Sequence, residues 1–138
     1  MLDDMTKGEA DAALREGGCM CGKVRFRTRG EPKWVLWCHC ADCRRHSGAP
    51  ASAYASFNLD AIELTRGEIT KFASSPPSLR GFCDHCGSTL TAEVDYMRGE
   101  LHFHIGAFDK PESLVPQGEA FSGERLPWTP ATGLVSVR

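Results

Sequence analysis

The sequence has no apolar run of about 18–20 residues, the length that a membrane-spanning helix needs. Residues 1–17 lack the cationic start and the apolar stretch of a secretory signal peptide, so we expect no export. Charge of one sign is not in excess either, because 16 Lys and Arg oppose 18 Asp and Glu, for a formal net charge of −2. This balance disfavours nucleic acid and anionic membranes as partners. We predict a single domain in a cytoplasmic protein.

Several enzyme motifs are missing as well: we find no Ser-His-Asp spacing, nucleotide-binding loop, paired-carboxylate site or internal repeat. Cysteine, by contrast, is abundant, with 7 residues in a chain of 138. This odd number excludes complete intramolecular disulfide pairing, and a share of about 5% is below that of disulfide scaffolds. Reduced thiols in this number favour metal binding.

The 14 Gly and 8 Pro residues favour short strands and turns over long helices. Alternating or short apolar runs predict strands over 23–29, 34–40, 51–57, 62–65, 69–72, 90–94 and 101–105. We expect one helical turn over 41–47 and a hairpin with its tip at Gly67-Glu68. Residues 1–17 should form a polar tail or short surface helix, and the chain from Pro111 onward should be mostly irregular. The fold class is mainly β with minor helix.

The seven cysteines fall into three short groups with metal-ligand spacing. They form a C-x-C pair at 19–21, a C-x-C-x-x-C group at 38–43 and a C-x-x-C pair at 83–86. Zinc prefers four ligands in a tetrahedron, so seven thiols divide into four and three. The economical division joins four of them in a closed structural zinc site: Cys19, Cys21, Cys83 and Cys86.

The remaining triplet, Cys38, Cys40 and Cys43, is open to three interpretations. Three protein ligands and one free position are typical of a catalytic zinc site. Alternatively, His46 closes the site as a fourth ligand from the same helical turn, or the thiols are redox-active or carry no metal. His39 is a poorer fourth ligand, because it should point to the opposite face of an extended segment.

Two further histidines, His102 and His104, share one face of the strand predicted over 101–105. A pair with this spacing can bind metal, but the strand predicted over 101–105 contains no acidic companion. We therefore favour surface or packing roles for both. Trp34 and Trp37 are most simply interpreted as core residues.

Four motifs follow one another along the chain and contain all seven cysteines. They are GGCMCGKVRF at 17–26, CHCADCR at 38–44 with SGAP at 47–50, FCDHCGSTL at 82–90 and GAFDKP at 106–111. Together they resemble the glutathione-dependent formaldehyde-activating enzyme family, whose domain also occurs in centromere protein V. The resemblance covers roughly residues 15–130, and Trp128 stands where the family tends to carry a late tryptophan.

The resemblance implies a β-tent fold of small twisted antiparallel sheets that is stabilised by zinc. It implies two zinc ions per chain, one structural on Cys19, Cys21, Cys83 and Cys86 and one catalytic on Cys38, Cys40 and Cys43. This agrees with the division into four and three that the spacing favours. The implied organisation is a polar N-terminal tail over 1–16, a zinc-binding domain over 17–130 and a C-terminal tail over 131–138.

The activity that the resemblance implies is that of a zinc-dependent carbon–sulfur lyase. Its substrates would be adducts of a small thiol such as glutathione with formaldehyde or another small aldehyde. Arg44 and Arg45 are candidates for binding the carboxylates of the thiol, with Lys33 a weaker one; a solvated cationic surface is the alternative for them. Two other functions stay open: a zinc-stabilised binding module without catalysis, and a thiol redox or metal-handling protein.

Overall fold

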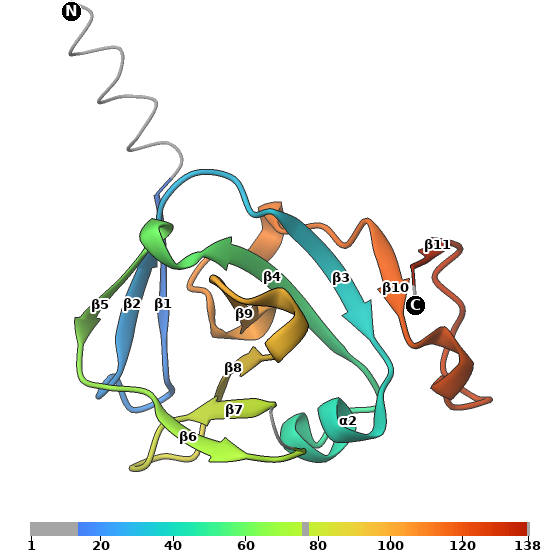
Figure 1. Ribbon diagram of the computed structural model, residues 1–138, viewed down its shortest axis with the longest axis horizontal. Helices are drawn as coiled ribbons and strands as arrows, with labels where there is room; N and C mark the ends of the chain where they lie inside the picture. Colours follow the sequence, from blue (N-terminus) through green and yellow to red (C-terminus); the bar gives the residue numbers. More distant parts are fainter. Residues whose placement is uncertain (1–13, 76–77, 138) are drawn as a thin grey trace, which may run out of the picture.

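Over residues 14–75 and 78–137, our computed structural model describes two β-sheets and one short α-helix (Figure 1). The smaller sheet has the order β1-β2-β5, with β1 at Arg15–Gly18, β2 at Arg25–Thr28 and β5 at Ile62–Arg66. The larger sheet has the order β11-β10-β3-β4-β9-β8-β7-β6 and consists of β3 (Trp34–Cys38), β4 (Ser52–Asn58), β6 (Thr70–Ala73), β7 (Leu79–Phe82), β8 (Thr89–Glu93), β9 (Glu100–His104), β10 (Gly118–Ala120) and β11 (Val135–Ser136). The helical segments are α2 (Ala41–Ser47) and the 3-10 turns η1 (Leu59–Ala61), η2 (Asp95–Met97), η3 (Ile105–Ala107), η4 (Pro111–Ser113) and η5 (Ser122–Glu124).

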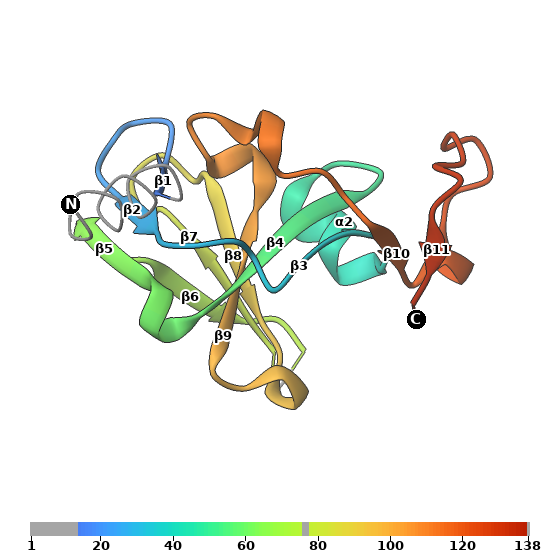
Figure 2. The same ribbon diagram turned by 90° about the horizontal axis from the view of Figure 1, so that it is seen from above.

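The fold is mainly β with minor helix, as the sequence predicts. Strand pairs are antiparallel except at one end of the larger sheet, where β10 runs parallel to both β3 and β11. The smaller sheet lies at one end of the molecule, and α2, β10 and β11 lie at the other (Figure 2). None of the described helices has the length and apolar character that crossing a bilayer requires.

Pairing in the larger sheet places one row of side chains across five strands. Trp34 on β3 pairs with Ser56 on β4, and Ser56 pairs with His102 on β9. His102 also pairs with Ala92 on β8, which in turn pairs with Arg80 on β7. Because side chains alternate between the faces of a sheet, all five residues project from the same face.

A second row on this face lies two residues further along the strands. Leu36 on β3 pairs with Tyr54 on β4, and Tyr54 pairs with His104 on β9. The two rows together bring aromatic, imidazole and guanidinium groups from five strands to one surface. That surface forms the floor of the candidate site.

The opposite face of the same strands carries the main hydrophobic core. Its buried members are Phe26, Val35, Ala55, Phe57, Leu101, Phe103, Phe108 and Leu114. Phe26 comes from the smaller sheet, and its ring centroid lies 4.1 Å from that of Phe103 and 5.1 Å from that of Phe108. The core therefore joins the two sheets, and its burial is the main hydrophobic contribution to stability.

Most of the predicted elements are present, including the helix over residues 41–47 and strands close to all seven predicted ranges. The helix has seven residues rather than a single turn, and it ends at Gly48, which takes the left-handed conformation with φ of 74°. Four short strands were not predicted from the sequence: β1, β7, β10 and β11. β1 occupies residues 15–18, part of the expected N-terminal tail or helix; residues 1–13 lie outside the described part of the chain.

The hairpin predicted at Gly67-Glu68 is wrong, because the two strands that flank it belong to different sheets. β5 pairs with β2 in the smaller sheet, whereas β6 pairs with β7 in the larger one. Gly67 has φ of 68°, and a Cβ atom there would lie 2.3 Å from the Lys23 carbonyl oxygen. The connection is thus held against the start of β2 and leads the chain from one sheet to the other.

Gly17 in β1 allows a close contact of the smaller sheet with the backbone of Ala107 and Phe108. A Cβ atom there would lie 2.3 Å from the Ala107 carbonyl oxygen and 2.5 Å from Cζ of Phe26. We expect Gly17→Ala to lower the free energy of unfolding by about 2 kcal/mol, measured by chemical denaturation, because backbone and ring must both move. Gly123→Ala, where the added methyl would meet open space, should change it by less than about 0.5 kcal/mol. Equal midpoints for the two variants would contradict this account.

Candidate metal centres

Four cysteine thiols meet where two tight turns face each other, one after β1 and one after β7. The Sγ atoms of Cys19 and Cys21 are 3.5 Å apart, and those of Cys21 and Cys83 are 3.8 Å apart. Cys86 completes the group, and all four Sγ atoms lie within 4.8 Å of one another. The structure thus brings together the four cysteines that the spacing assigns to one cluster.

Backbone hydrogen bonds shape both turns around their sulfur atoms. The amide of Val24 donates to Cys19 Sγ over 3.2 Å, and the amide of His85 donates to Cys83 Sγ over 3.4 Å. Hydrogen bonds from Ser88 lower the pKa of the Cys86 thiol to about 5. Donors directed at sulfur stabilise thiolates, the form of cysteine that binds metal.

The second cluster forms where β3 passes into α2. Cys38 ends β3, Cys40 is the N-cap of α2 and Cys43 lies in its first turn. The Cys40 side chain accepts a hydrogen bond from the Cys43 amide over 3.3 Å, so the helix start itself orients both thiols. Cys43 Sγ lies 3.2 Å from Cys38 Sγ and 2.9 Å from Cys40 Sγ.

Both clusters offer a donor set that suits zinc. Zn–S bonds of about 2.3 Å in a tetrahedron place sulfur atoms about 3.8 Å apart. The four-cysteine cluster has nearly this spacing, with Sγ separations of 3.5 and 3.8 Å. In the three-cysteine cluster the Sγ separations are shorter, 2.9 and 3.2 Å, as expected for thiols that hydrogen-bond to one another. This cluster provides three ligands for one metal ion.

Neither histidine near the triplet joins its group of ligand atoms, which among the described residues contains the three thiols alone. His39 is buried and points toward β10, where its Nε2 lies 3.0 Å from Oε1 of Glu119. The His46 ring packs against His104, with ring centroids 5.4 Å apart. His39 therefore faces away from the thiols, as predicted, and His46 does not close the site in this structure.

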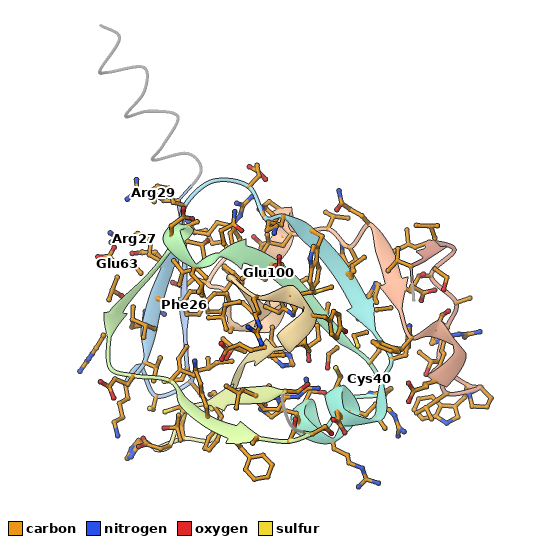
Figure 3. The ribbon with its side chains drawn as sticks, viewed as in Figure 1. Phe26, Arg27, Arg29, Cys40, Glu63 and Glu100 are labelled. Carbon is orange, nitrogen blue, oxygen red and sulfur yellow. The ribbon has the colours of Figure 1, made fainter. Side chains whose placement is uncertain are left out.

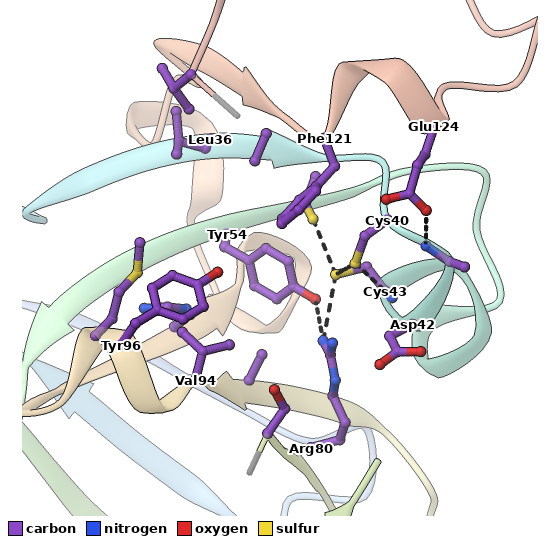
Figure 4. A pocket seen from close by; sticks show the side chains of 18 of the residues that line it. Leu36, Cys40, Asp42, Cys43, Tyr54, Arg80, Val94, Tyr96, Phe121 and Glu124 are labelled. Atoms are coloured by element: carbon purple, nitrogen blue, oxygen red, sulfur yellow. Dashed lines mark hydrogen bonds between the residues drawn. The ribbon is translucent and has the colours of Figure 1, made fainter. Parts of the chain in front are cut away.

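The triplet forms part of the wall of a cavity of about 670 Å³ on the polar and aromatic face of the larger sheet (Figure 4). Cys38, Cys40 and Cys43 all line this cavity, whereas the four cysteines of the other cluster do not. The remaining walls come from β3, α2, β4, β7, β8, η2, β9, β10, η5 and residues next to these elements: Trp34, Leu36, Ala41, Asp42, Tyr54, Ser78, Arg80, Ala92, Val94, Tyr96, Met97, His102, Ala120, Phe121, Glu124 and Val137.

Arg80 and Tyr54 link the floor of the cavity to the thiols. Arg80 Nη1 donates to Tyr54 Oη over 3.2 Å and to Cys43 Sγ over 3.5 Å (Figure 4). Hydrogen bonds from the Cys38 and Cys40 thiols lower the pKa of the Cys43 thiol. The Tyr54 hydroxyl and the Arg80 guanidinium lower that pKa further, so the cavity favours negative charge at Cys43.

Arg80 stays charged in this setting although it is buried. Desolvation opposes its charge, but the negative charge at Cys43 raises the pKa of the guanidinium above its ordinary value. Burial and the same charge at Cys43 raise the pKa of Tyr54, so the phenol keeps its proton. The cavity floor thus carries one fixed cation and one hydroxyl donor beside the thiols.

A buried carboxylate, Glu100, organises the other end of the floor; it is the first residue of β9 and is labelled in Figure 3. Its Oε1 accepts hydrogen bonds from Ser56 Oγ over 2.8 Å and from Trp34 Nε1 over 3.2 Å, and it lies 3.0 Å from His102 Nε2. Its Oε2 lies 2.6 Å from Lys33 Nζ. The His102 and His104 side chains are thus packed in the interior, and burial lowers the pKa of each, to about 3 for His104.

Phe121 has the most unusual backbone among the cavity residues. Its φ of 55° and ψ of 42° lie in the left-handed region, and no other described non-glycine residue has a positive φ. Its ring packs against the cluster that contains Cys38, Cys43 and Tyr54. A bulky residue in this conformation is uncommon, and such strain persists where the surroundings hold it in place.

The predicted cationic residues lie elsewhere. Arg44 and Arg45 are on α2 but do not line the cavity, and Lys33 is paired with Glu100. Binding of a substrate carboxylate by Arg44 or Arg45 stays a prediction. Arg80, Tyr54 and Phe121 were not identified as site residues from the sequence. Only Arg80 has a recognisable sequence signal, a charged residue among the apolar residues of the LRGF segment at 79–82.

The β-rich fold and the two cysteine clusters, one of which faces a cavity, define a protein with two candidate metal sites. The model of the glutathione-dependent formaldehyde-activating enzyme family matches residues 14–124. The chain therefore belongs to that family, as its motifs predicted.

Two relatives and one solved structure are similar to the chain. An uncharacterised lyase of Schizosaccharomyces pombe is 29% identical over 93 residues, which are 67% of this chain and 66% of the relative. A Halomonas elongata protein, named provisionally as a glutathione-dependent formaldehyde-activating enzyme, is 33% identical over 85 residues, 56% of this chain and 54% of the relative. The chain thus spans less than two thirds of both. A crystal structure of a Rhodobacter sphaeroides protein shares the fold, with a TM-score of 0.57 and 21% identity over 68% of this chain and 87% of that one.

The hydrogen bonds of Glu100 lead us to expect that the stability of the fold depends on pH. Burial alone would raise the pKa of Glu100, but its hydrogen bonds with Lys33 and Ser56 lower it. A lowered pKa means that the ionised group stabilises the fold above its ordinary pKa, and that this contribution is lost as the pH falls through the lowered value. We expect Glu100→Gln to cost about 2 kcal/mol of unfolding free energy at pH 7.

The measurement is chemical denaturation of both proteins across a pH series. The difference between wild type and Glu100→Gln should shrink as the pH falls from the ordinary pKa of a glutamate through the lowered pKa of Glu100, because the wild-type carboxylate then becomes protonated. Glu68→Gln, a change at an exposed position, serves as the control and should leave stability nearly unchanged. A difference that is independent of pH would show that the carboxylate charge is not what stabilises the network.

Proposed function

We propose that the protein is a zinc-dependent carbon–sulfur lyase that forms and cleaves adducts of a small thiol such as glutathione with formaldehyde or another small aldehyde. One observation carries the proposal: Cys38, Cys40 and Cys43 line a cavity large enough for a ligand, whereas the other four cysteines do not. The names of the two relatives, a lyase and a formaldehyde-activating enzyme, support the same class of reaction. All seven cysteines are free of disulfides, which suits a reducing compartment such as the cytoplasm.

The two clusters then have different tasks. Cys19, Cys21, Cys83 and Cys86 would hold a structural zinc with four thiolates, a closed set that joins the turns after β1 and β7. Cys38, Cys40 and Cys43 would hold a second zinc through three thiolates. If zinc is bound by these three thiolates, it would favour the thiolate form of an incoming thiol.

The residues of the cavity would support the reaction in both directions. When an adduct forms, the thiolate sulfur attacks the carbonyl carbon, the C–S bond forms and the carbonyl π electrons move onto oxygen. Tyr54 Oη can donate a hydrogen bond to that oxygen while the oxygen takes up a proton from water, and Arg80 stabilises negative charge on either group. In cleavage the hydroxyl proton passes to water, the C=O bond is restored and the sulfur departs with the C–S electron pair.

Replacement of single cysteines separates catalytic from structural metal binding. We expect Cys40→Ser to reduce bound zinc from two ions to about one and to slow adduct exchange at least tenfold while the fold persists. Serine is a good N-cap, so residue 40 should still cap α2 and the helix should still begin at Ala41. Cys86→Ser is the matched variant of the other cluster and should instead lower the melting temperature, because structural zinc contributes to folding.

Metal analysis, thermal denaturation and exchange NMR on thiol–formaldehyde mixtures are the measurements. If the zinc-loaded protein accelerates exchange with none of several thiols, the lyase proposal fails and a zinc-stabilised binding module becomes the better interpretation. In that case Cys40→Ser should lose thermal stability together with its zinc. A wild-type protein with about one zinc and free thiols would instead favour a redox or metal-handling role.

Arg44 and Arg45 are proposed to bind a carboxylate of the thiol on the outer side of α2. Because neither lines the cavity, they can reach only a thiol whose body extends beyond it, such as glutathione. We expect Arg45→Gln to raise KM for glutathione about fivefold, the effect of losing about 1 kcal/mol, and to leave KM for 2-mercaptoethanol unchanged. Arg66→Gln on β5 is the control. Equal KM values for glutathione in all three proteins would remove Arg45 from the site.

A further inference from the structure

The cavity beside the triplet is far larger than formaldehyde requires. Its volume of about 670 Å³ lies within the range of sites that enclose ligands of drug size, about 300–1,000 Å³. The reacting carbon, oxygen and sulfur occupy a small part of it near Cys38, Cys40 and Cys43. Most of the space is therefore left for a substituent on the adduct.

The walls around that space are mainly apolar. β3 contributes Trp34 and Leu36, β8 and its end contribute Ala92 and Val94, and Phe121 packs on the thiol side. Figure 4 shows Leu36, Tyr54, Val94 and Phe121 around the same opening. A polar substituent placed here would lose its water without gaining hydrogen bonds, whereas an apolar one gains from burial.

The charged groups of the cavity disfavour an anionic substituent. Among the described residues that line it, Arg80 is the one Lys or Arg side chain, while Asp42 and Glu124 are acidic. Arg80 already donates to Cys43, Tyr54 and Ser74. The carboxylates of a glutathione-like thiol would therefore meet no free cation inside the cavity, and their place is outside it.

The backbone of Phe121 supports the interpretation that the apolar wall belongs to a ligand site. Its ring packs on the thiol cluster although its backbone adopts the left-handed conformation, which bulky side chains rarely take. Strain of this kind concentrates at ligand sites, where the surroundings hold it. A residue that tolerates this backbone, such as asparagine, would relieve the strain but remove the apolar wall.

We propose that the site prefers adducts that carry an apolar substituent over the plain formaldehyde adduct of a small polar thiol. This inference rests on the proposed lyase function. The reaction is unchanged, R–CH(OH)–S–R′ giving R–CHO and R′–SH, with the hydroxyl proton passing to the sulfur and no oxidant involved. The apolar group can belong to the aldehyde or to the thiol, and the experiment distinguishes these two sources.

The test compares exchange rates by NMR in three mixtures at equilibrium, with and without the zinc-loaded protein. The reference is formaldehyde with 2-mercaptoethanol. The second mixture replaces the aldehyde with 3-methylbutanal, and the third replaces the thiol with phenylmethanethiol. We expect the protein to accelerate exchange at least tenfold more in one apolar mixture than in the reference, and the mixture that responds identifies the source.

Two outcomes contradict different claims. Equal acceleration in all three mixtures, or the greatest acceleration in the reference, overturns the apolar preference and leaves the proposed function intact. No acceleration in any mixture overturns the proposed function itself, and the preference that depends on it falls as well.

Phe121→Asn tests the wall directly, with Phe72→Asn on β6 as the matched control at an exposed phenylalanine. We expect Phe121→Asn to reduce acceleration about tenfold more in the apolar mixture than in the reference, and Phe72→Asn to leave the ratio between mixtures as in the wild type. An equal fall in both mixtures, or no change, overturns the role of the wall.

A second pair keeps the test informative if Phe121→Asn does not fold. Val94→Thr places a hydroxyl in the wall with almost no change in shape, and Val115→Thr makes the same change at an exposed position outside the cavity. We expect Val94→Thr to lower the apolar preference about threefold and Val115→Thr to leave it unchanged. Identical preferences in both variants overturn the role of this wall position.

Discussion

The register between β3, β4, β9, β8 and β7 is the constraint on which both core and site depend. Because side chains alternate along each strand, one register sends Val35, Ala55 and Phe103 to the core and their neighbours to the cavity floor. A slip by one residue between any two of these strands would expose the core and bury charged groups without partners. Stability and the geometry of the site are thus set by the same pairing.

Burial of the two charged groups on the floor, Glu100 and Arg80, is tolerated because neighbouring strands and α2 supply their partners. Glu100 satisfies donors from β3, β4 and β9, and Arg80 on β7 reaches Tyr54 on β4 and Cys43 on α2. Buried charges without partners cost much more than buried hydrogen-bonded ones. The networks therefore orient the side chains of the floor before any ligand binds, which reduces the reorganisation that binding or reaction requires.

The sequence predicted what depends on local spacing and missed what depends on long-range pairing. Cysteines with one or two residues between them must lie together, so local spacing predicted three groups. Their division into two clusters followed from the four ligands that zinc prefers, and the structure brings the same thiols together. Arg80, Tyr54 and Phe121 reach the cavity from β7, β4 and the segment after β10, and β7 and β10 are too short to show a clear alternation. The false hairpin at Gly67 has the same origin, since a turn signal does not reveal that its two strands pair with other partners.

The positions of the two clusters explain how one short domain can combine stability with an open site. The four-cysteine cluster joins turns more than sixty residues apart and contacts the buried Val24 and Leu90, so loss of its ligands would loosen both sheets. The triplet lies within six residues, from the end of β3 to the first turn of α2, a helix that begins after its N-cap Cys40 and ends at Gly48. Because its geometry is local, its fourth side can face the cavity without weakening the core. Under the proposed function, the four thiols would form a closed metal site, and the three thiols a site that can exchange its remaining ligand.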